Sequence, residues 1–416
     1  MDRMDLLLEL WELIFQRLCL NDIMNFRATC RSWQKAADAI FSSQLPFMLS
    51  LSLGSPNNFG SLSVPWSNHY STVLTEKWPR EIDSSSYNKV FLVQGWLVFN
   101  LFHYELVKGQ TFSELLFFNP FSRARFKLPK LFLFYEGWCH YQVRVAFNSA
   151  PPGSEEFVVA FLIVVCKVYF VVAFLIVVCK VYNLIGPEHR KQRLAFIRFK
   201  QGSWIESIET DELFYDIEVH DNNKLYGLTF KHGTSVVFVF TLGDNHGDDH
   251  VVERLVMLNT IEEGIDFSKL LLSDEFFKRS HQMVMDTSTG ELLIVRHLRS
   301  RCYDTEGFTV FKLDRKNLKW CEVFDIGDRF LFWDYTKVSL VSAKGLRLAE
   351  RFKRGNCIFF CHANTPLCPY QPQYRYNGFK EYDIGVFFLA DRTISHFLIS
   401  SSLPISRWNM WFSPAP

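Results

Sequence analysis

From Pro46 onward the apolar residues of this chain come in runs of five to eight, and residues typical of turns follow each run. The segments 90–101, 141–147 and 281–297 show the pattern, which yields roughly fifteen to twenty strand candidates. Within the last segment, Asp-Thr-Ser-Thr-Gly at 286–290 predicts a tight turn between two strands. Because no long helical pattern interrupts the strands, the sequence argues against a parallel sheet built from strand–helix–strand units and predicts a mainly-β domain.

The composition agrees with many strands and limits the classes of partner. Phe occurs 42 times among 416 residues, and aromatic residues favour pleated, half-buried strands. The formal net charge is only +1, so no whole-chain field attracts nucleic acid, and we expect no nucleic-acid partner. The acidic start of the chain lacks the basic segment of a secretory signal. We therefore expect a cytoplasmic or nuclear protein whose ten Cys are thiols.

One sequence module recurs along the predicted β domain. It consists of an apolar strand, a polar turn and a second strand that opens with an aromatic or apolar residue. The module is found at 117–129, 197–207, 310–324 and 386–397, and 235–245 is a possible further opening. The spacings are about 40 residues or twice that, which is typical of divergent β-propeller blades of four strands each.

The first 45 residues follow a different, helical period. Apolar residues recur at spacings of three and four at Leu6, Leu10, Leu13, Ile14 and Leu18, which predicts one face of a helix. Asn21 is a suitable N-cap for a second short helix, and a third would hold Trp33. Because three short helices bury little surface by themselves, we expect this unit to be covered by a partner or by the neighbouring domain.

The helical segment resembles an F-box, on the residues that match the pattern of that family. These are Leu6, Glu9, Leu10, Ile14, Arg17, Leu18, Asp22, Ile23, Arg27, Cys30 and Trp33. The chain departs from the pattern at Leu7, where the family has Pro, and at Trp11, where it usually has Leu. Because Pro fixes φ at a helix start, its absence is expected to weaken the entry turn by on the order of 1 kcal/mol.

The F-box resemblance implies a Skp-type adaptor as partner and, through it, a cullin–RING ubiquitin ligase. The adaptor-binding residues would be Leu6, Leu7, Leu10, Ile14, Leu18, Ile23, Phe26, Arg27 and Trp33. Trp33 is expected to hold the three helices together. The alternative is a small helical cap that packs only on the main domain.

Beyond the F-box, the order of motifs is similar to that of plant F-box/kelch-type proteins. The motifs run from FFNPFSRARFKLP at 117–129 through GNCIFF at 355–360 to DIGVFFLADRTI at 383–394. The resemblance implies an α+β, mainly β chain: an F-box at 1–45, a linker with the first strands at 46–88, and a propeller of divergent kelch-type blades at 89–416. Such a chain is a non-catalytic substrate receptor without a cofactor. Its substrate-binding residues and its target are unknown.

The string FVVAFLIVVCKVY occurs twice without a gap, at 157–169 and 170–182. One copy alone predicts a buried central strand, because it is rich in Val, Ile and Phe. Two copies are also long enough to span a bilayer, although Lys167 near the middle would cost about 2.5–3.5 kcal/mol. The β-branched composition and the strands on both sides favour strands, which makes membrane tethering the less favoured alternative. An intact repeat among diverged ones indicates a recent tandem duplication or an incorrect gene model.

Three further groups of residues were candidates for ligand sites. The cluster Cys357, Cys361, His362 and Cys368 lacks the spacing of a clear second pair of zinc ligands, so packed thiols are predicted. The segment 243–250 and the basic runs at 189–193, 297–301 and 351–355 are predicted as solvated loops. No phosphate-binding loop, nucleophile elbow or zinc-protease motif is present in the sequence. A propeller that binds a ligand unrelated to ubiquitin stays open as an alternative.

Overall fold

A computed structural model gives the fold of the chain. In the first 46 residues it describes Leu10, Ile14, Asp22, Thr29 and Trp33. Beyond them it describes strands β1 to β26 with residues beside them, namely 119, 124, 128–130, 148, 157, 288–290, 300, 304, 315–317, 324–328, 337, 343, 352, 355–356, 389–392 and 397. The structural statements below concern these residues only.

The described strands form six sheets, which we number as blades 1 to 6. Blade 1 holds β4 (Lys89–Val93), β5 (Trp96–Glu105), β6 (Gln110–Phe118), β7 (Arg125–Lys127) and β8 (Leu131–Leu133). Blade 2 holds β9 (Cys139–Phe147), β10 (Val158–Lys167), β11 (Arg190–Arg198) and β12 (Trp204–Thr210). Blade 3 holds β13 (Phe214–His220), β14 (Lys224–Lys231), β15 (Thr234–Thr241) and β16 (Val251–Leu258).

The remaining three blades complete the set. Blade 4 holds β17 (Arg279–Asp286), β18 (Glu291–Arg299), β19 (Thr305–Asp314) and β20 (Lys319–Val323). Blade 5 holds β21 (Arg329–Asp334), β22 (Val338–Ser342), β23 (Cys357–Ala363), β24 (Tyr382–Phe388) and β25 (Thr393–His396). Blade 6 joins β26 (Trp408–Phe412) to β1 (Phe47–Ser52), β2 (Phe59–Ser63) and β3 (Thr72–Leu74).

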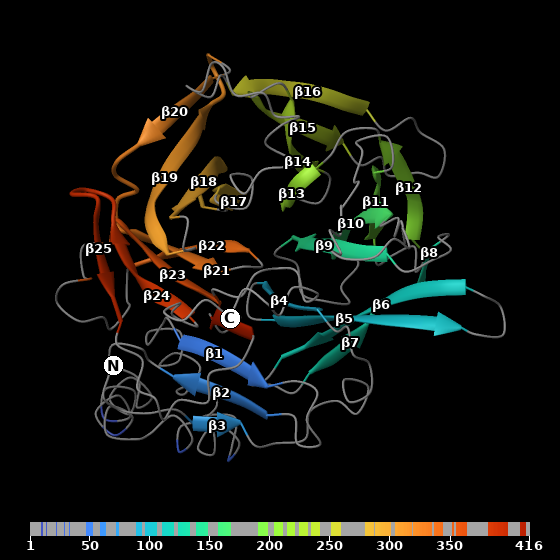
Figure 1. Cartoon of the computed structure of the whole chain (residues 1–416), viewed down its shortest axis with the longest axis horizontal. Helices are drawn as coiled ribbons and strands as arrows, with labels where there is room; N and C mark the ends of the chain where they lie inside the picture. Colours follow the sequence, from blue (N-terminus) through green and yellow to red (C-terminus); the bar gives the residue numbers. More distant parts are fainter. Residues whose placement is uncertain are drawn as a thin grey trace, which may run out of the picture.

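The six blades stand in a ring, with one strand of each toward the centre (Figure 1). Neighbouring inner strands are in contact from β4 through β9, β13 and β17 to β22, and β26 contacts both β4 and the strands of blade 5. The ring is therefore closed, and the mainly-β propeller predicted from the sequence is confirmed. Closure leaves only short, protected sheet edges.

Two features of the topology were beyond the sequence prediction. Blade 6 combines strands from both ends of the β domain, because β26 pairs with β1 in the antiparallel register Leu49↔Met410. In blade 5, β21 and β23 run parallel, with Leu331 opposite Ile358, while β22 forms the inner edge. Pairing of the first and last strands ties the ring shut, since opening it would break a whole ladder of backbone hydrogen bonds.

The recurring sequence module marks a hairpin in four of the six described blades. It contains the turns that join β6 to β7, β11 to β12, β19 to β20 and β24 to β25, and the possible further opening at 235–245 falls on β15 of blade 3. In blade 1 the turn closes with a bond from the Asn119 N–H to the Ala124 carbonyl, and Phe117 pairs with Phe126. The reading of the module as a propeller repeat is therefore confirmed, although the described part of the chain contains 26 strands, more than the sequence predicted.

The first copy of the doubled string is a central strand, as its composition predicted. Val158–Lys167 forms β10, which pairs antiparallel with β9 on one side and β11 on the other. Phe157, Val159 and Ala160 are buried. The second copy lies outside the described residues. Among the residues that the structure does describe, no helix is both long and apolar enough to cross a membrane.

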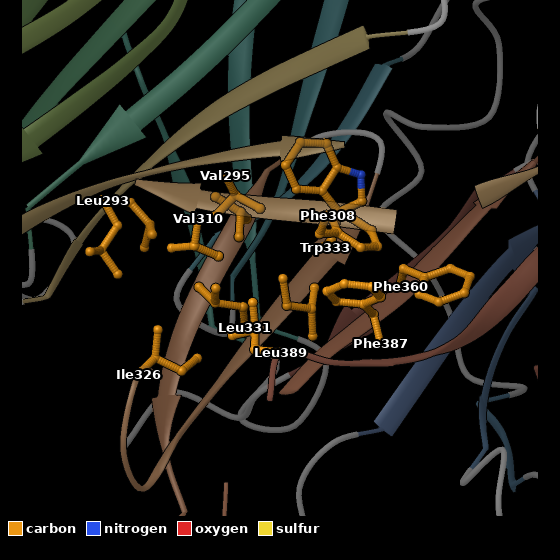
Figure 2. Packing of buried hydrophobic residues seen from close by; sticks show 13 residues of the cluster. Leu293, Val295, Phe308, Val310, Ile326, Leu331, Trp333, Phe360, Phe387 and Leu389 are labelled. Atoms are coloured by element: carbon orange, nitrogen blue, oxygen red, sulfur yellow. The ribbon is translucent and has the colours of Figure 1, made fainter. Parts of the chain in front are cut away.

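The many aromatic residues fill the spaces between blades. Phe308 on β19 packs against Trp333 on β21 with ring centroids 5.6 Å apart, and against Phe387 at 5.7 Å. Figure 2 shows this cluster, in which blades 4 and 5 face each other. Between blades 1 and 2, the rings of Phe117 and Phe157 meet edge to face at 5.8 Å. Burying such rings supplies much of the free energy that holds adjacent sheets together.

Candidate functional site

The N-terminal helical segment presents two apolar side chains to solvent. Leu10 and Ile14 are both helical, and they remain 55% and 44% exposed. Residues four positions apart lie on the same face of a helix, so the two side chains are neighbours on one stripe. Together with Phe324, they are the large hydrophobic residues that stay exposed in the described part of the chain. An apolar stripe of this kind is typical of a protein-binding surface.

The other predicted adaptor-binding residues are described only in part. Trp33 is helical and half-buried, and it has an interaction partner, while Asp22 is helical and exposed. Both positions agree with the predicted helices. Outside the described residues lie Leu6, Leu7, Leu18, Ile23, Phe26 and Arg27. The adaptor-binding role of all these residues stays a prediction.

At the centre of the ring, two carboxylates of β13 accept hydrogen bonds from backbone N–H groups of β17, the inner strand of the next blade. The Met283 N–H donates to Asp216 Oδ2 at 2.6 Å, and the Met285 N–H donates to the Glu218 carboxylate. Asp216 and Glu218 are two residues apart on a strand, so they face the same side. An inner strand has unpaired backbone N–H groups, and these carboxylates pair with them where a further strand would otherwise be needed.

Lys337 completes this central cluster from the turn between β21 and β22. Its ammonium group pairs with the Glu218 carboxylate and lies 3.3 Å from the Ile217 carbonyl oxygen, 120 positions earlier in the chain. Burial raises the pKa of Glu218, and the charge and hydrogen bond of Lys337 partly oppose that rise. The Gln282 amide also donates to the Asp334 carbonyl at 3.0 Å. Polar contacts thus link the inner strands of blades 3 and 4 to Asp334 and Lys337 of blade 5.

A second polar cluster lies between blades 4 and 5, around the fully buried His297. Arg299 Nε donates to His297 Nδ1 at 3.1 Å, so Nδ1 accepts and Nε2–H donates to Thr305 Oγ1 at 3.0 Å. Thr305 N in turn donates to Asp383 Oδ2 at 2.5 Å, and the other oxygen of Asp383 lies 3.0 Å from His396 Nδ1. Both ring nitrogens of His297 are occupied and its ring stacks on Phe308, so this imidazole is a structural element.

Gly355 and Asn356 connect three segments beside blade 5. Both have left-handed backbones, with φ of 69° and 56°. Asn356 Oδ1 accepts from the Ile326 N–H at 3.0 Å, and its backbone bonds reach Arg329 and Leu389. Left-handed conformations favour Gly and, to a lesser degree, Asn. The Gly-Asn pair therefore fixes the exit from blade 4 to the start of β21 and to the last turn of blade 5.

The predicted thiol cluster is part of the core. Cys357 and Cys361 lie buried in β23, where burial raises the pKa of each thiol well above its usual range. Cys361 Sγ lies 3.9 Å from Met48 Sδ. Cys368 lies outside the described residues. Within the described ranges, no three His, Cys, Asp or Glu side chains come together as they would around a metal ion.

The prediction of solvated loops was wrong for two of the basic runs. Residues 297–299 belong to β18, with His297 fully buried, and 190–193 belong to β11. In the third run, Phe352 is buried. The charged residues in these short runs led to the prediction of loops. The apolar residues around them instead placed the runs in the sheets. The segment 243–250 lies outside the described residues.

The central charged groups were not singled out from the sequence. Asp216 and Glu218 occur in an alternating strand pattern in which every second residue is polar, a pattern that usually faces solvent. Lys337 stands between β21 and β22, and the sequence around it carries no distinctive signal. Only the closure of the ring brings these side chains together, so no local pattern could have identified them.

Comparison with solved structures found matches at low similarity only. TolB from Acinetobacter baumannii is 9% identical, with a TM-score of 0.41 over 92% of this chain and 73% of that one. An oligogalacturonate lyase in complex with manganese is 9% identical, with a TM-score of 0.36 over 85% of this chain and 84% of that one. Neither likeness carries an argument about activity.

Comparison with curated proteins found no match. Two family models match the chain. The F-box domain matches residues 4–40, which confirms the F-box predicted from Leu6 to Trp33. The KIB1-4 beta-propeller matches residues 62–388, which is most of the chain and covers blades 1 to 4 in full and blade 5 as far as β24. The chain therefore belongs to the KIB1-4 beta-propeller family and carries an F-box domain ahead of the propeller.

Proposed function

We propose that this chain is the substrate-recognition subunit of a Skp–cullin–F-box ubiquitin ligase. The observation that carries the proposal is the exposed pair Leu10 and Ile14, four residues apart on a helix within the F-box match. The pair offers an apolar stripe to a Skp-type adaptor, while the propeller offers a separate, rigid body to a target protein. A propeller of the kelch type, a plant source and a cytoplasmic or nuclear location belong to the same proposal.

In the proposed mechanism, this chain brings the target near the ubiquitin-conjugating enzyme and carries out no chemical step itself. The adaptor and cullin hold a charged ubiquitin-conjugating enzyme near the target that the propeller binds, which raises the effective concentration of the reacting groups. The chain itself contributes two binding surfaces and no catalytic group.

Replacing Leu10 and Ile14 together by Asp tests the proposal. Two carboxylates in an apolar interface would be desolvated without partners, so capture of a purified Skp-type adaptor should fall by at least about tenfold. The measurement is pull-down of the adaptor by full-length protein, quantified against adaptor concentration.

The matched control is Lys316→Asp, which makes the same change in net charge. Lys316 is exposed in the turn between β19 and β20, far along the chain from the F-box. This variant should capture the adaptor as well as the unmodified protein does. Equal capture by the Leu10/Ile14 double variant, or no capture by the folded unmodified chain, would remove the proposal.

A further inference from the structure

A single large aromatic residue stands exposed on the described surface of the propeller. Phe324 follows β20 and is 54% exposed, although its neighbour Ile326 is buried in the core between blades 4 and 5. The loop that carries Phe324 is pinned, because Asn356 bonds both to the Phe324 carbonyl and to the Ile326 N–H. The ring is therefore presented by a fixed backbone, so little conformational entropy would be lost on binding.

Arg392 lies over this ring from the adjacent blade. Its guanidinium is 5.2 Å from the ring centroid of Phe324, and its Nη2 lies 2.5 Å from Glu322 Oε1. The Arg392 backbone is left-handed, at φ 57°, in the turn between β24 and β25. Cation–π contact and the ion pair together hold one face of the ring beside a guanidinium. Aromatic and Arg side chains in such an arrangement are typical anchors of protein interfaces.

The charge around the ring is negative once the ion pair is accounted for. Glu322 offsets Arg392, while Asp325, the residue after Phe324, and Asp391, the residue before Arg392, each add an exposed carboxylate. Asp325 accepts from the Gly327 N–H at 2.7 Å, and Asp391 accepts from the N–H and hydroxyl of Thr393. These Thr393 bonds lower the pKa of Asp391, so its carboxylate stays charged at neutral pH.

We infer that this surface, made of Glu322, Phe324, Asp325, Asp391 and Arg392, binds an extended peptide segment that presents an apolar side chain flanked by Lys or Arg. The apolar side chain would cover the Phe324 ring, and the basic side chains would reach the two flanking carboxylates. This inference rests on the proposed function and adds the class of target segment that the propeller would select. An acidic segment would meet like charges and bind more weakly.

Two pools of fluorescein-labelled nonapeptides test the inference by fluorescence anisotropy with the full-length protein. Both pools carry Leu or Phe at the centre, flanked by Lys and Arg in one and by Asp and Glu in the other. The basic pool should bind saturably and the acidic pool at least about tenfold more weakly. Phe324→Ala should weaken binding of the basic pool by about tenfold or more, because it removes the apolar anchor.

Two variants, each of which removes one negative charge, distinguish an effect of the charge beside Phe324 from an effect of the net charge. Asp391→Asn keeps an oxygen acceptor for Thr393 but removes the charge, and should weaken binding of the basic pool several-fold and reduce its salt dependence. Glu306→Gln removes one exposed carboxylate elsewhere, on β19, and should leave binding unchanged. Equal binding of the two pools, absence of saturable binding, or full binding by Phe324→Ala would overturn the inference.

Adaptor capture by the same variants keeps the two proposals apart. The surface lies on blades 4 and 5, so none of these variants should change capture of the Skp-type adaptor. If the unmodified protein binds the basic pool but captures no adaptor, the ligase function fails and the peptide surface stands. If it captures the adaptor but binds no peptide, only the peptide surface fails.

Discussion

Replacing Lys337 with Met is expected to lower the free energy of unfolding at neutral pH by about 3–5 kcal/mol. Lys337 and Glu218 are both almost fully buried at the centre of the ring, and Met removes the cation while keeping much of the side-chain length. The Glu218 carboxylate would then be a buried charge without its main partner, which is the costly case for an ion pair. The melting temperature and the urea midpoint of the purified protein measure the effect.

The loss should shrink as the pH falls. Burial raises the pKa of Glu218 in the folded protein, and removing Lys337 removes an influence that lowers it, so the pKa rises further. A raised carboxyl pKa means that the folded state holds its proton more tightly than the unfolded state does. The contribution of Glu218 is therefore most favourable below the unfolded pKa and is lost as pH rises through the folded pKa. The deficit of Lys337→Met should be smaller at pH 5 than at pH 8.

Two variants make this prediction specific. Lys312→Met removes the cation from the ion pair with Glu291, where both side chains are partly exposed, and should cost less than about 1 kcal/mol. Combining Lys337→Met with Glu218→Gln should recover part of the stability and remove the pH dependence. A deficit that does not change with pH would show that the loss arises from packing alone.

Replacing Gly355 with Ala is expected to destabilise the protein by about 3 kcal/mol or more. The backbone at Gly355 has φ of 69°, a conformation that costs an L-residue about 1–2 kcal/mol. In addition, a Cβ would lie 2.7 Å from the Gly327 carbonyl oxygen and 2.8 Å from the Arg329 nitrogen. Both are backbone atoms that cannot rotate away, so the segment must shift, and overpacking of this kind typically costs about 1–3 kcal/mol. Thermal unfolding of the variant measures the total loss of stability from the backbone conformation and the clash.

Gly327 supplies the matched control. It has the same φ of 69°, but a Cβ there would meet no atom within 4 Å. Gly327→Ala should therefore cost only the backbone term, about 1–2 kcal/mol. Similar losses for the two variants would mean that the clash at Gly355 is relieved and that the Gly-Asn junction is less rigid than its hydrogen bonds indicate.

Local patterns in the sequence determined which segments became strands and where neighbouring strands join. The turn predicted at 286–290 joins β17 to β18, with Gly290 at φ 69° and its N–H bonded to the Asp286 carbonyl. The recurring module predicted a hairpin in each of blades 1, 2, 4 and 5, because alternation and turn chemistry act between residues close in sequence. The N-terminal helices were likewise predicted from their apolar period, and the match to the family pattern is what identified them as an F-box.

Tertiary structure alone decided how the blades join and which polar groups meet. The pairing of β26 with β1 brings together segments more than 350 positions apart, and no local pattern specifies that pairing. The same holds for Lys337 and Glu218, and for Arg392 over Phe324. Alternation and turn residues act over a few positions, whereas contacts between blades depend on how whole sheets are placed around the ring. The sequence thus determined the strands and their order, and the packing of the blades against one another determined the central ion pair and the exposed aromatic surface.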